Sequence, residues 1–277
     1  QKGVLVFLAR DAEQRVMCYS NAHVTKSGQA DEILRFVQFW KQQTGQAPQE
    51  LVFDSQLTTY ANLHRLDAQG IRFLTLRRRT RKLLAEIYAR PSSAWRRVTL
   101  RSLTRTYRTP RVFDERIRLR DYGDKPIRQL SILDLGHEEP TILITNDMRA
   151  TPATLITRYA QRMLIENGIA EAVKFFHLNA LSSPILIKVH FDVVMTMVAD
   201  TLYTMLARKL RGFEECDAHK LFRHFVKGKG TIEVQNGNVT VVFPRRARNP
   251  ILRSVPWEHL PNALPASNDT ALTLRFS

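Results

Sequence analysis

Four side chains able to do chemistry lie in one segment, residues 158–176: Tyr159, Arg162, Glu166 and Lys174. The segment is predicted to form a single α-helix, in which residues three, four and seven apart share a face. Tyr159, Arg162 and Glu166 would then project together. Carboxylates bind hard divalent cations, and guanidinium groups hold phosphate oxygens through forked hydrogen bonds. This stripe therefore suits a metal ion bound beside a phosphate, although a solvated polar stripe on a surface helix is the plain alternative.

A second carboxylate, Asp54, directly follows the apolar run Leu51-Val52-Phe53, which is predicted to be a short buried strand. Ligand sites in α/β sheets favour the carboxyl ends of strands, and the helix that carries Glu166 could pack beside this end. Asp54 and Glu166 would together hold divalent metal ions. The expected ions are Mg²⁺ or Mn²⁺, because the ligands are all oxygen atoms. Taken alone, Asp54 could instead cap the helix that follows it.

The composition points to a polyanionic partner. The chain has 277 residues, a net charge of +16 and 44% hydrophobic residues, which is enough for a packed core and argues against global disorder. Residues 72–128 contain 18 Lys and Arg residues against 5 acids, and they include the run Arg77, Arg78 and Arg79. Arginine suits phosphate recognition, so this segment is expected to bind nucleic acid. A charged, solvated face is the alternative.

The order of predicted elements indicates an α/β fold with a mixed sheet. We expect a hairpin at residues 3–20, helices near 30–40 and 58–69, and strands at 51–53, 71–76 and 129–146. The basic segment alternates polar and apolar residues, which predicts a β-rich insertion with one wet face. An apolar helix at about 184–210 is expected to be buried, because its charged residues disfavour a membrane span. Asn236-Gly237-Asn238 predicts a hairpin across 231–243.

These patterns predict four segments along the chain: a first core part at 1–76, the basic insertion at 77–140, a second core part at 141–211, and a C-terminal helix, hairpin and loosely held tail at 212–277. Cys18 and Cys216 lack CxxC spacing, so neither a disulfide framework nor a zinc site is expected. This cysteine usage favours a reducing cytoplasm. No membrane partner is expected.

The spacing of the first group of residues resembles a known signature. Tyr159, Arg162 and Glu166 are separated by two and three residues, and Lys174 follows after seven, one more than the six usual in that signature. The segments 51–55, 75–79 and 158–167 are similar as well, and the likeness extends over about residues 4–255. In these features the chain resembles the DDE transposases of bacterial insertion sequences, in the branch named for its Y-R-E-K signature.

The resemblance implies an RNase H-like core, interrupted between the second and third catalytic acids by a β-rich insertion. It makes Asp54 the second acid and Glu166 the third, and it makes Tyr159, Arg162 and Lys174 contacts to DNA near the cleaved phosphate. The implied activity is metal-dependent cleavage at the ends of an insertion sequence, followed by strand transfer to target DNA. The implied location is the bacterial cytoplasm, on the nucleoid when DNA is bound. Synapsis of two DNA ends would suit a homodimer.

The first acid of the family sits on a strand that would precede Gln1, so the chain is expected to be a core without that strand. Asp11, Asp147 and Asp192 are weaker substitutes. A non-catalytic, basic DNA-binding remnant is therefore the alternative function. A tyrosine recombinase is disfavoured, because it would surround its tyrosine with several His and Arg groups and His177 is the only histidine nearby.

Overall fold

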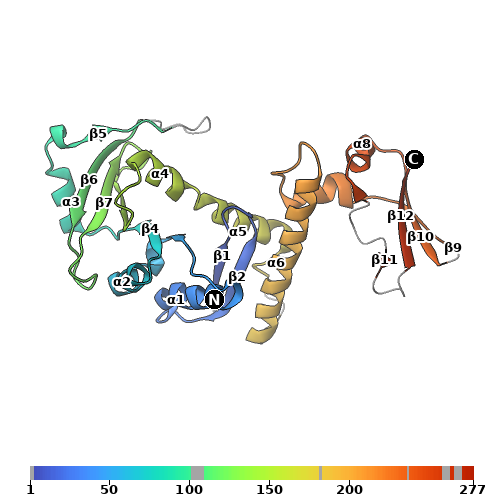
Figure 1. Cartoon of the computed structure of the whole chain (residues 1–277), viewed down its shortest axis with the longest axis horizontal. Helices are drawn as coiled ribbons and strands as arrows, with labels where there is room; N and C mark the ends of the chain where they lie inside the picture. Colours follow the sequence, from blue (N-terminus) through green and yellow to red (C-terminus); the bar gives the residue numbers. More distant parts are fainter. Residues whose placement is uncertain (1–2, 101–108, 181–182, 236, 258–262, 265–269) are drawn as a thin grey trace. The chain divides into compact units, whose positions relative to one another are not determined.

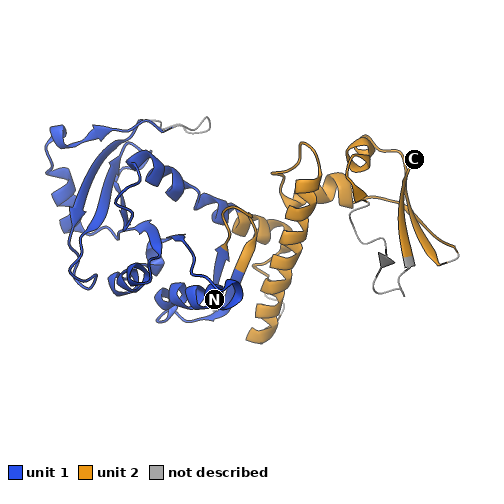
Figure 2. Ribbon diagram, viewed as in Figure 1, with its two compact units in different colours: residues 1–9, 19–167 blue, residues 10–18, 168–277 orange. Residues whose placement is uncertain are grey.

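The computed structural model describes residues 3–100, 109–180, 183–235, 237–257, 263–264 and 270–277. The chain is a mixed α/β protein with two compact units, drawn in different colours in Figure 2: residues 1–9 with 19–167, and residues 10–18 with 168–277. Arg101, Arg105 and Arg108 of the predicted basic insertion lie outside the described residues.

The first unit contains the helices and strands expected from the sequence between residues 19 and 76, and it adds a helix, α3 (Arg81–Tyr88), to the segment that was expected to be β-rich. Its helices and strands between residues 32 and 160 are α1 (Glu32–Thr44), β3 (Glu50–Phe53), α2 (Tyr60–Ala68), β4 (Arg72–Leu76), α3, β5 (Arg96–Arg97), β6 (Arg111–Ile117), β7 (Ile127–Leu133), β8 (Thr141–Thr145) and α4 (Pro152–Ala160) (Figure 1). Short 3₁₀ turns lie at Gln29–Asp31, Ser55–Leu57 and Ser92–Ala94. The N-terminal strands β1 (Leu5–Arg10) and β2 (Met17–Val24) pair with each other as predicted.

One six-stranded sheet organises this unit, in the order β3-β4-β8-β7-β6-β5. Strands β3 and β4 are parallel, whereas β8, β7, β6 and β5 each pair antiparallel with the preceding strand in that order. The predicted mixed sheet is therefore confirmed. The strands of the expected basic insertion extend this same sheet, because β7 pairs with β8 along its length.

The sheet carries helices on both faces. Neighbouring residues of a strand point to opposite faces, and on β8 Leu143 packs with Leu155 and Ile156 of α4, whereas Ile142 packs with Leu83 and Ile87 of α3. Strand β7 is buried along nearly its whole length, as expected for a central strand covered on both sides. On β6, exposed and covered residues alternate, so the predicted wet face belongs to this strand.

The second unit is built from helices and a separate small sheet. Its elements are the later part of α5 (Met163–Phe176), α6 (Leu186–Lys209), α7 (Ala218–Leu221), a π-helical turn (Phe222–Val226), β9 (Thr231–Gln235), β10 (Asn238–Phe243), α8 (Asn249–Arg253), β11 (Ala263–Leu264) and β12 (Thr270–Phe276). The order of its sheet is β11-β12-β10-β9. The predicted hairpin is confirmed, since β9 and β10 pair antiparallel. The tail differs from expectation, because β12 pairs with β10 in parallel over residues 271–276.

Helix α6 corrects one expectation. The sequence predicted a buried core helix, and the segment is helical, yet Ile187, Phe191 and Leu202 are each more than 60% exposed. Only Val189, Val193 and Ala207 of this helix are buried. The apolar residues surround the helix instead of forming one stripe, so a single packed face cannot cover them all. Within the described residues, no helix is long and apolar enough to cross a membrane.

Candidate metal and phosphate site

Strand β3 aims its acidic residues at one face of the sheet. Alternate residues of a strand share a face, so Glu50, Val52 and Asp54 point away from the buried pair Leu51 and Phe53. This is the face that α4 covers. Both acids therefore reach the arginines at the end of α4 and in the turn that follows it.

Asp54 uses its two oxygens differently. Its Oδ1 accepts hydrogen bonds from the backbone N–H of Gln56 at 3.1 Å and from Ser55 Oγ at 3.0 Å. These bonds cap the short 3₁₀ turn that follows β3, as the plain reading of the sequence expected. Its Oδ2 instead faces Arg162 Nη1 at 3.3 Å. One oxygen fixes the orientation of the carboxylate, and the other is directed at the site.

The predicted single helix over 158–176 is wrong. Helix α4 ends at Ala160 and α5 begins at Met163, and the turn between them is held by i to i−3 hydrogen bonds, including Arg162 N–H to Tyr159 O at 3.0 Å and Ile165 N–H to Arg162 O at 3.1 Å. In such a turn, residues three apart lie directly above each other. The Arg162 guanidinium accordingly lies 5.5 Å from the centre of the Tyr159 ring. No Gly or Pro marks this break in the sequence.

The two predicted acids converge on one cationic atom. Arg162 Nη1 lies 2.8 Å from Glu166 Oε1 and 3.3 Å from Asp54 Oδ2. Because both oxygens contact the same nitrogen atom, Asp54 Oδ2 and Glu166 Oε1 lie close to each other. The side chains of Asp54 and Glu166 are 43% and 50% exposed, so solutes reach both carboxylates. A place between two carboxylates that already holds a positive group is suited to a divalent cation.

Two hydrogen-bond donors beside the acids are buried without an acceptor among the described residues: Tyr159 Oη and Arg162 Nε. Such donors are costly unless a ligand or water satisfies them. Burial raises the pKa of Tyr159 to about 12, against the opposing effect of Arg162. Tyr159 is therefore a phenol at neutral pH, available to donate. Burial works to lower the pKa of Arg162, but Tyr159, Glu166 and Asp54 outweigh it and raise the value.

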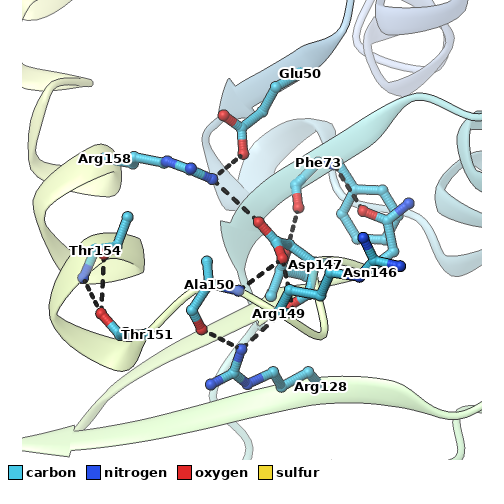
Figure 3. Close-up of polar contacts among 11 residues, drawn as sticks. Glu50, Phe73, Arg128, Asn146, Asp147, Arg149, Ala150, Thr151, Thr154 and Arg158 are labelled. Atoms are coloured by element: carbon cyan, nitrogen blue, oxygen red, sulfur yellow. Dashed lines mark hydrogen bonds and ion pairs between the residues drawn. The ribbon is translucent and has the colours of Figure 1, made fainter.

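A second arginine bridge, which the sequence did not reveal, holds α4 against the sheet (Figure 3). Arg158 Nη1 lies 3.1 Å from both Glu50 Oε1 and Asp147 Oδ2. Asp147 Oδ1 also accepts the backbone N–H groups of Arg149 and Ala150, each at 2.9 Å. Arg158 and Arg162 are four residues apart, as are Glu50 and Asp54, so the two bridges repeat one arrangement along β3 and α4.

The arrangement around Asp147 makes it part of the fold. Burial alone would raise the pKa of Asp147, but the N–H groups of Ala150 and Arg149 and the Arg158 guanidinium outweigh it and lower the pKa. Arg128 completes the network by donating to the backbone oxygens of Asp147 at 3.1 Å and Ala150 at 2.6 Å. Asp147 is therefore occupied by these contacts, and the structure does not bring it to Asp54 and Glu166.

Replacement of Arg158 should destabilise the fold more than replacement of Arg162. The Arg158→Gln variant leaves Asp147, whose side chain is only 9% exposed, without its charge partner, and we expect a loss of about 1–3 kcal/mol in the free energy of unfolding. The Arg162→Gln variant should lose less than about 1 kcal/mol, because its partners are half exposed. Urea denaturation of both variants checks this order, and equal losses would contradict it.

The Asp147 carboxylate makes the stability of the fold depend on pH. Because the pKa of folded Asp147 lies below its ordinary value, its stabilisation is complete above about pH 4 and is lost as the pH falls through the lowered value. The Arg158→Gln variant should therefore lose less stability on acidification than the parent chain.

The remaining predicted site residues are distributed over both units. Arg77 is held inside the first unit, where it donates to Gln129 Oε1 at 2.6 Å. Arg78 is exposed beside the site and donates to Ser55 O at 3.3 Å. Arg79 pairs with Glu139 at 2.8 Å. Lys174 belongs to the second unit.

The weaker acid candidates have other surroundings. Asp11 belongs to the second unit and caps its own turn by accepting the N–H of Gln14, and Asp192 lies on α6. Among the described residues, no group of three or more His, Cys, Asp or Glu side chains forms a candidate metal site. The acid pair thus supplies two carboxylates.

No protein-family model matches the chain, and no curated protein matches it.

Proposed function

We propose that this chain is the catalytic domain of a DNA transposase of the Y-R-E-K branch of DDE enzymes, built on an RNase H-like core. Its activity would be metal-dependent cleavage of DNA at the ends of an insertion sequence and transfer of the strand to target DNA. The observation that supports this proposal most strongly is the convergence of Asp54 Oδ2 and Glu166 Oε1 on one cationic atom.

The surrounding residues fit a phosphodiester substrate. The Arg162 side chain is 21% exposed beside the two acids, so a phosphate oxygen could reach its guanidinium group. Arg78 adds an exposed positive charge beside Ser55. A phosphate bound to the Arg162 guanidinium group would orient the scissile bond against the acids. The high pKa of Tyr159 disfavours a phenolate nucleophile, so the proposed nucleophile is water or a DNA 3′-hydroxyl.

The oxygen ligands fit Mg²⁺ or Mn²⁺, which Asp54 and Glu166 would hold. A divalent ion there would supply activation of the attacking oxygen and stabilisation of the leaving oxygen. The chain's own part is to orient Asp54 through its Ser55 and Gln56 bonds, to place Glu166 in the first turn of α5, and to bind the phosphate through Arg162.

A salt titration tests whether DNA is the partner and whether it passes beside the acids. Each protein–phosphate ion contact contributes about −0.9 to the slope of log affinity against log salt. The Arg78→Gln variant should therefore bind duplex DNA more weakly, with a slope smaller in magnitude by about 0.9. Fluorescence anisotropy between low and moderate salt gives both values.

Arg111→Gln is the matched control, because Arg111 already forms two hydrogen bonds to Asp134, at 2.7 and 3.1 Å. Its slope should equal that of the parent chain. If the slope of Arg78→Gln is unchanged, DNA does not contact this side of the site. Retained DNA binding without divalent-metal binding would instead favour the alternative, a non-catalytic basic remnant.

A further inference from the structure

The second unit contains an open pocket with a composition unlike the acid site. Its volume is about 490 Å³, and it is lined by Lys174, Phe175, His177, His219, Phe222, Arg223 and Lys227. This size lies within the range of about 300–1,000 Å³ usual for ligand pockets. Apart from the two phenylalanines, every lining residue is basic, and none of the lining residues is acidic. The pocket therefore favours an anionic ligand with an apolar or aromatic part.

The two phenylalanines that line this pocket form its aromatic wall, and other aromatic side chains pack against them. The rings of Phe175 and Phe222 lie 5.6 Å apart, and Phe175 and His219 lie 5.8 Å apart. Phe175 also meets Tyr203 of α6 edge-on at 5.6 Å. Because Phe175 and Phe222 are only partly buried, they present ring surface to the pocket while their other sides are packed. A planar, unstacked base could rest on such a surface.

A π-helical turn brings a cation to this wall. Residues Phe222–Val226 form the turn, and the N–H of Lys227 closes it by donating to Phe222 O at 2.6 Å. This i to i+5 bond places Lys227 one turn beyond Phe222 and thus on the same side, where an ordinary α-helix would turn it away. Lys227, Arg223 and Lys174 surround the rings with positive charge, which suits the phosphate attached to a stacked base.

We propose that this pocket binds one unpaired nucleotide of a DNA strand, with the base against Phe222 and Phe175 and its phosphate at Lys174, Arg223 and Lys227. The proposal rests on the proposed function for its choice of DNA. An unpaired nucleotide is required, because a base inside a duplex has no free face. Such nucleotides occur at the strand ends that cleavage produces, so the pocket would hold a cut end.

A second open pocket among the described residues offers a matched control. That pocket has a volume of about 370 Å³ and is lined by Ser183, Ile187, Lys188, Phe191 and Asp192. It also contains one exposed phenylalanine and one lysine, but the lysine is accompanied by an acid. The test pair is Phe222→Leu with Lys227→Gln, and the control pair is Phe191→Leu with Lys188→Gln. Leucine keeps apolar volume at Phe222 and removes only the aromatic face.

The experiment measures the affinity of each double variant, at one salt concentration, for three labelled DNAs: a blunt duplex, the same duplex with a short single-stranded overhang, and that overhang with abasic sites. The test pair should bind the overhang DNA about tenfold more weakly than the parent chain, since a stacked base contributes on that scale. Its affinity for the blunt duplex should fall by less than about threefold, which is the loss expected when one phosphate contact is removed. The control pair should match the parent chain on all three DNAs.

The possible results distinguish failure of the pocket proposal from failure of the proposed function. If the test pair and the parent chain bind the overhang DNA equally while both bind DNA well, the pocket proposal is overturned and the proposed function stands. An equal loss on the abasic overhang would show phosphate binding without base stacking, which also overturns it. If a free deoxynucleoside monophosphate competes as well as the oligonucleotide, the ligand is a soluble nucleotide. If the parent chain binds no DNA, the proposed function fails, and this inference with it.

Discussion

Replacement of Glu166 by glutamine should weaken the binding of Mn²⁺ by at least about tenfold, because loss of a supporting contact to a metal site already costs about 10–100-fold. Glutamine keeps the size of the side chain and its helical preference, but it removes the charge that a divalent ion requires. The α5 turn and the Tyr159 contact should therefore persist. Isothermal titration with Mn²⁺, or the loss of the electron paramagnetic resonance signal of free Mn²⁺, measures the affinity.

The matched control is Glu50→Gln. Glu50 also faces an arginine between two carboxylates, at 3.1 Å, but the second carboxylate there is Asp147, which is buried and bonded to backbone N–H groups. That pair offers no open position for an ion. Mn²⁺ affinity should therefore be unchanged in Glu50→Gln, and an equal loss in both variants would mean that general negative charge, not the Asp54–Glu166 pair, attracts the metal.

Replacement of Arg162 by glutamine should affect metal and DNA in opposite directions. The guanidinium competes with a metal ion for Asp54 Oδ2 and Glu166 Oε1. Exposed ion pairs contribute about 0.2–1 kcal/mol each, so removal of both pairs should strengthen Mn²⁺ binding about two- to thirtyfold. Affinity for DNA in the presence of Mg²⁺ should fall about tenfold or more, because hydrogen bonds to a charged group contribute about 1.5–3 kcal/mol.

The conservative variant separates charge from shape. Arg162→Lys keeps a cation that competes with the metal, so its Mn²⁺ affinity should stay near that of the parent chain. Lysine lacks the planar fork that matches a phosphate, so DNA affinity should still fall. If Arg162→Gln leaves both affinities unchanged, the residue is only a surface partner of the acids and has no part in ligand binding.

The convergence of Asp54 and Glu166 on Arg162 was predictable, because Asp54 follows a buried strand at the edge where ligand sites form and Glu166 shares a helical face with Arg162. Asp54 follows a run of three apolar residues, which identifies a buried strand and its carboxyl edge. The mixed sheet was predictable as well, since the strands have clear apolar runs and a predicted helix separates β3 from β4. These features depend on sequence patterns formed by residues that are close together in the chain.

Other features depend on contacts between distant segments. The break between α4 and α5 has no Gly or Pro signal, and its tight turn places Arg162 against Asp54, 108 residues away. The Arg158 bridge joins Glu50 and Asp147. These two acids are far apart in the sequence and belong to no common motif. The exposure of α6 was missed because an apolar composition alone does not say how much surface a neighbouring element covers.

The anomalous scattering of Mn²⁺ in a crystal of this chain would show directly whether Asp54 and Glu166 bind a metal ion. We expect an anomalous peak at coordination distance, about 2.0–2.2 Å, from Asp54 Oδ2 and Glu166 Oε1, with the Arg162 guanidinium moved away from both oxygens. If Arg162 stays between the two carboxylates at saturating Mn²⁺ and no peak lies beside them, the acid pair is a structural ion pair and the metal site does not exist.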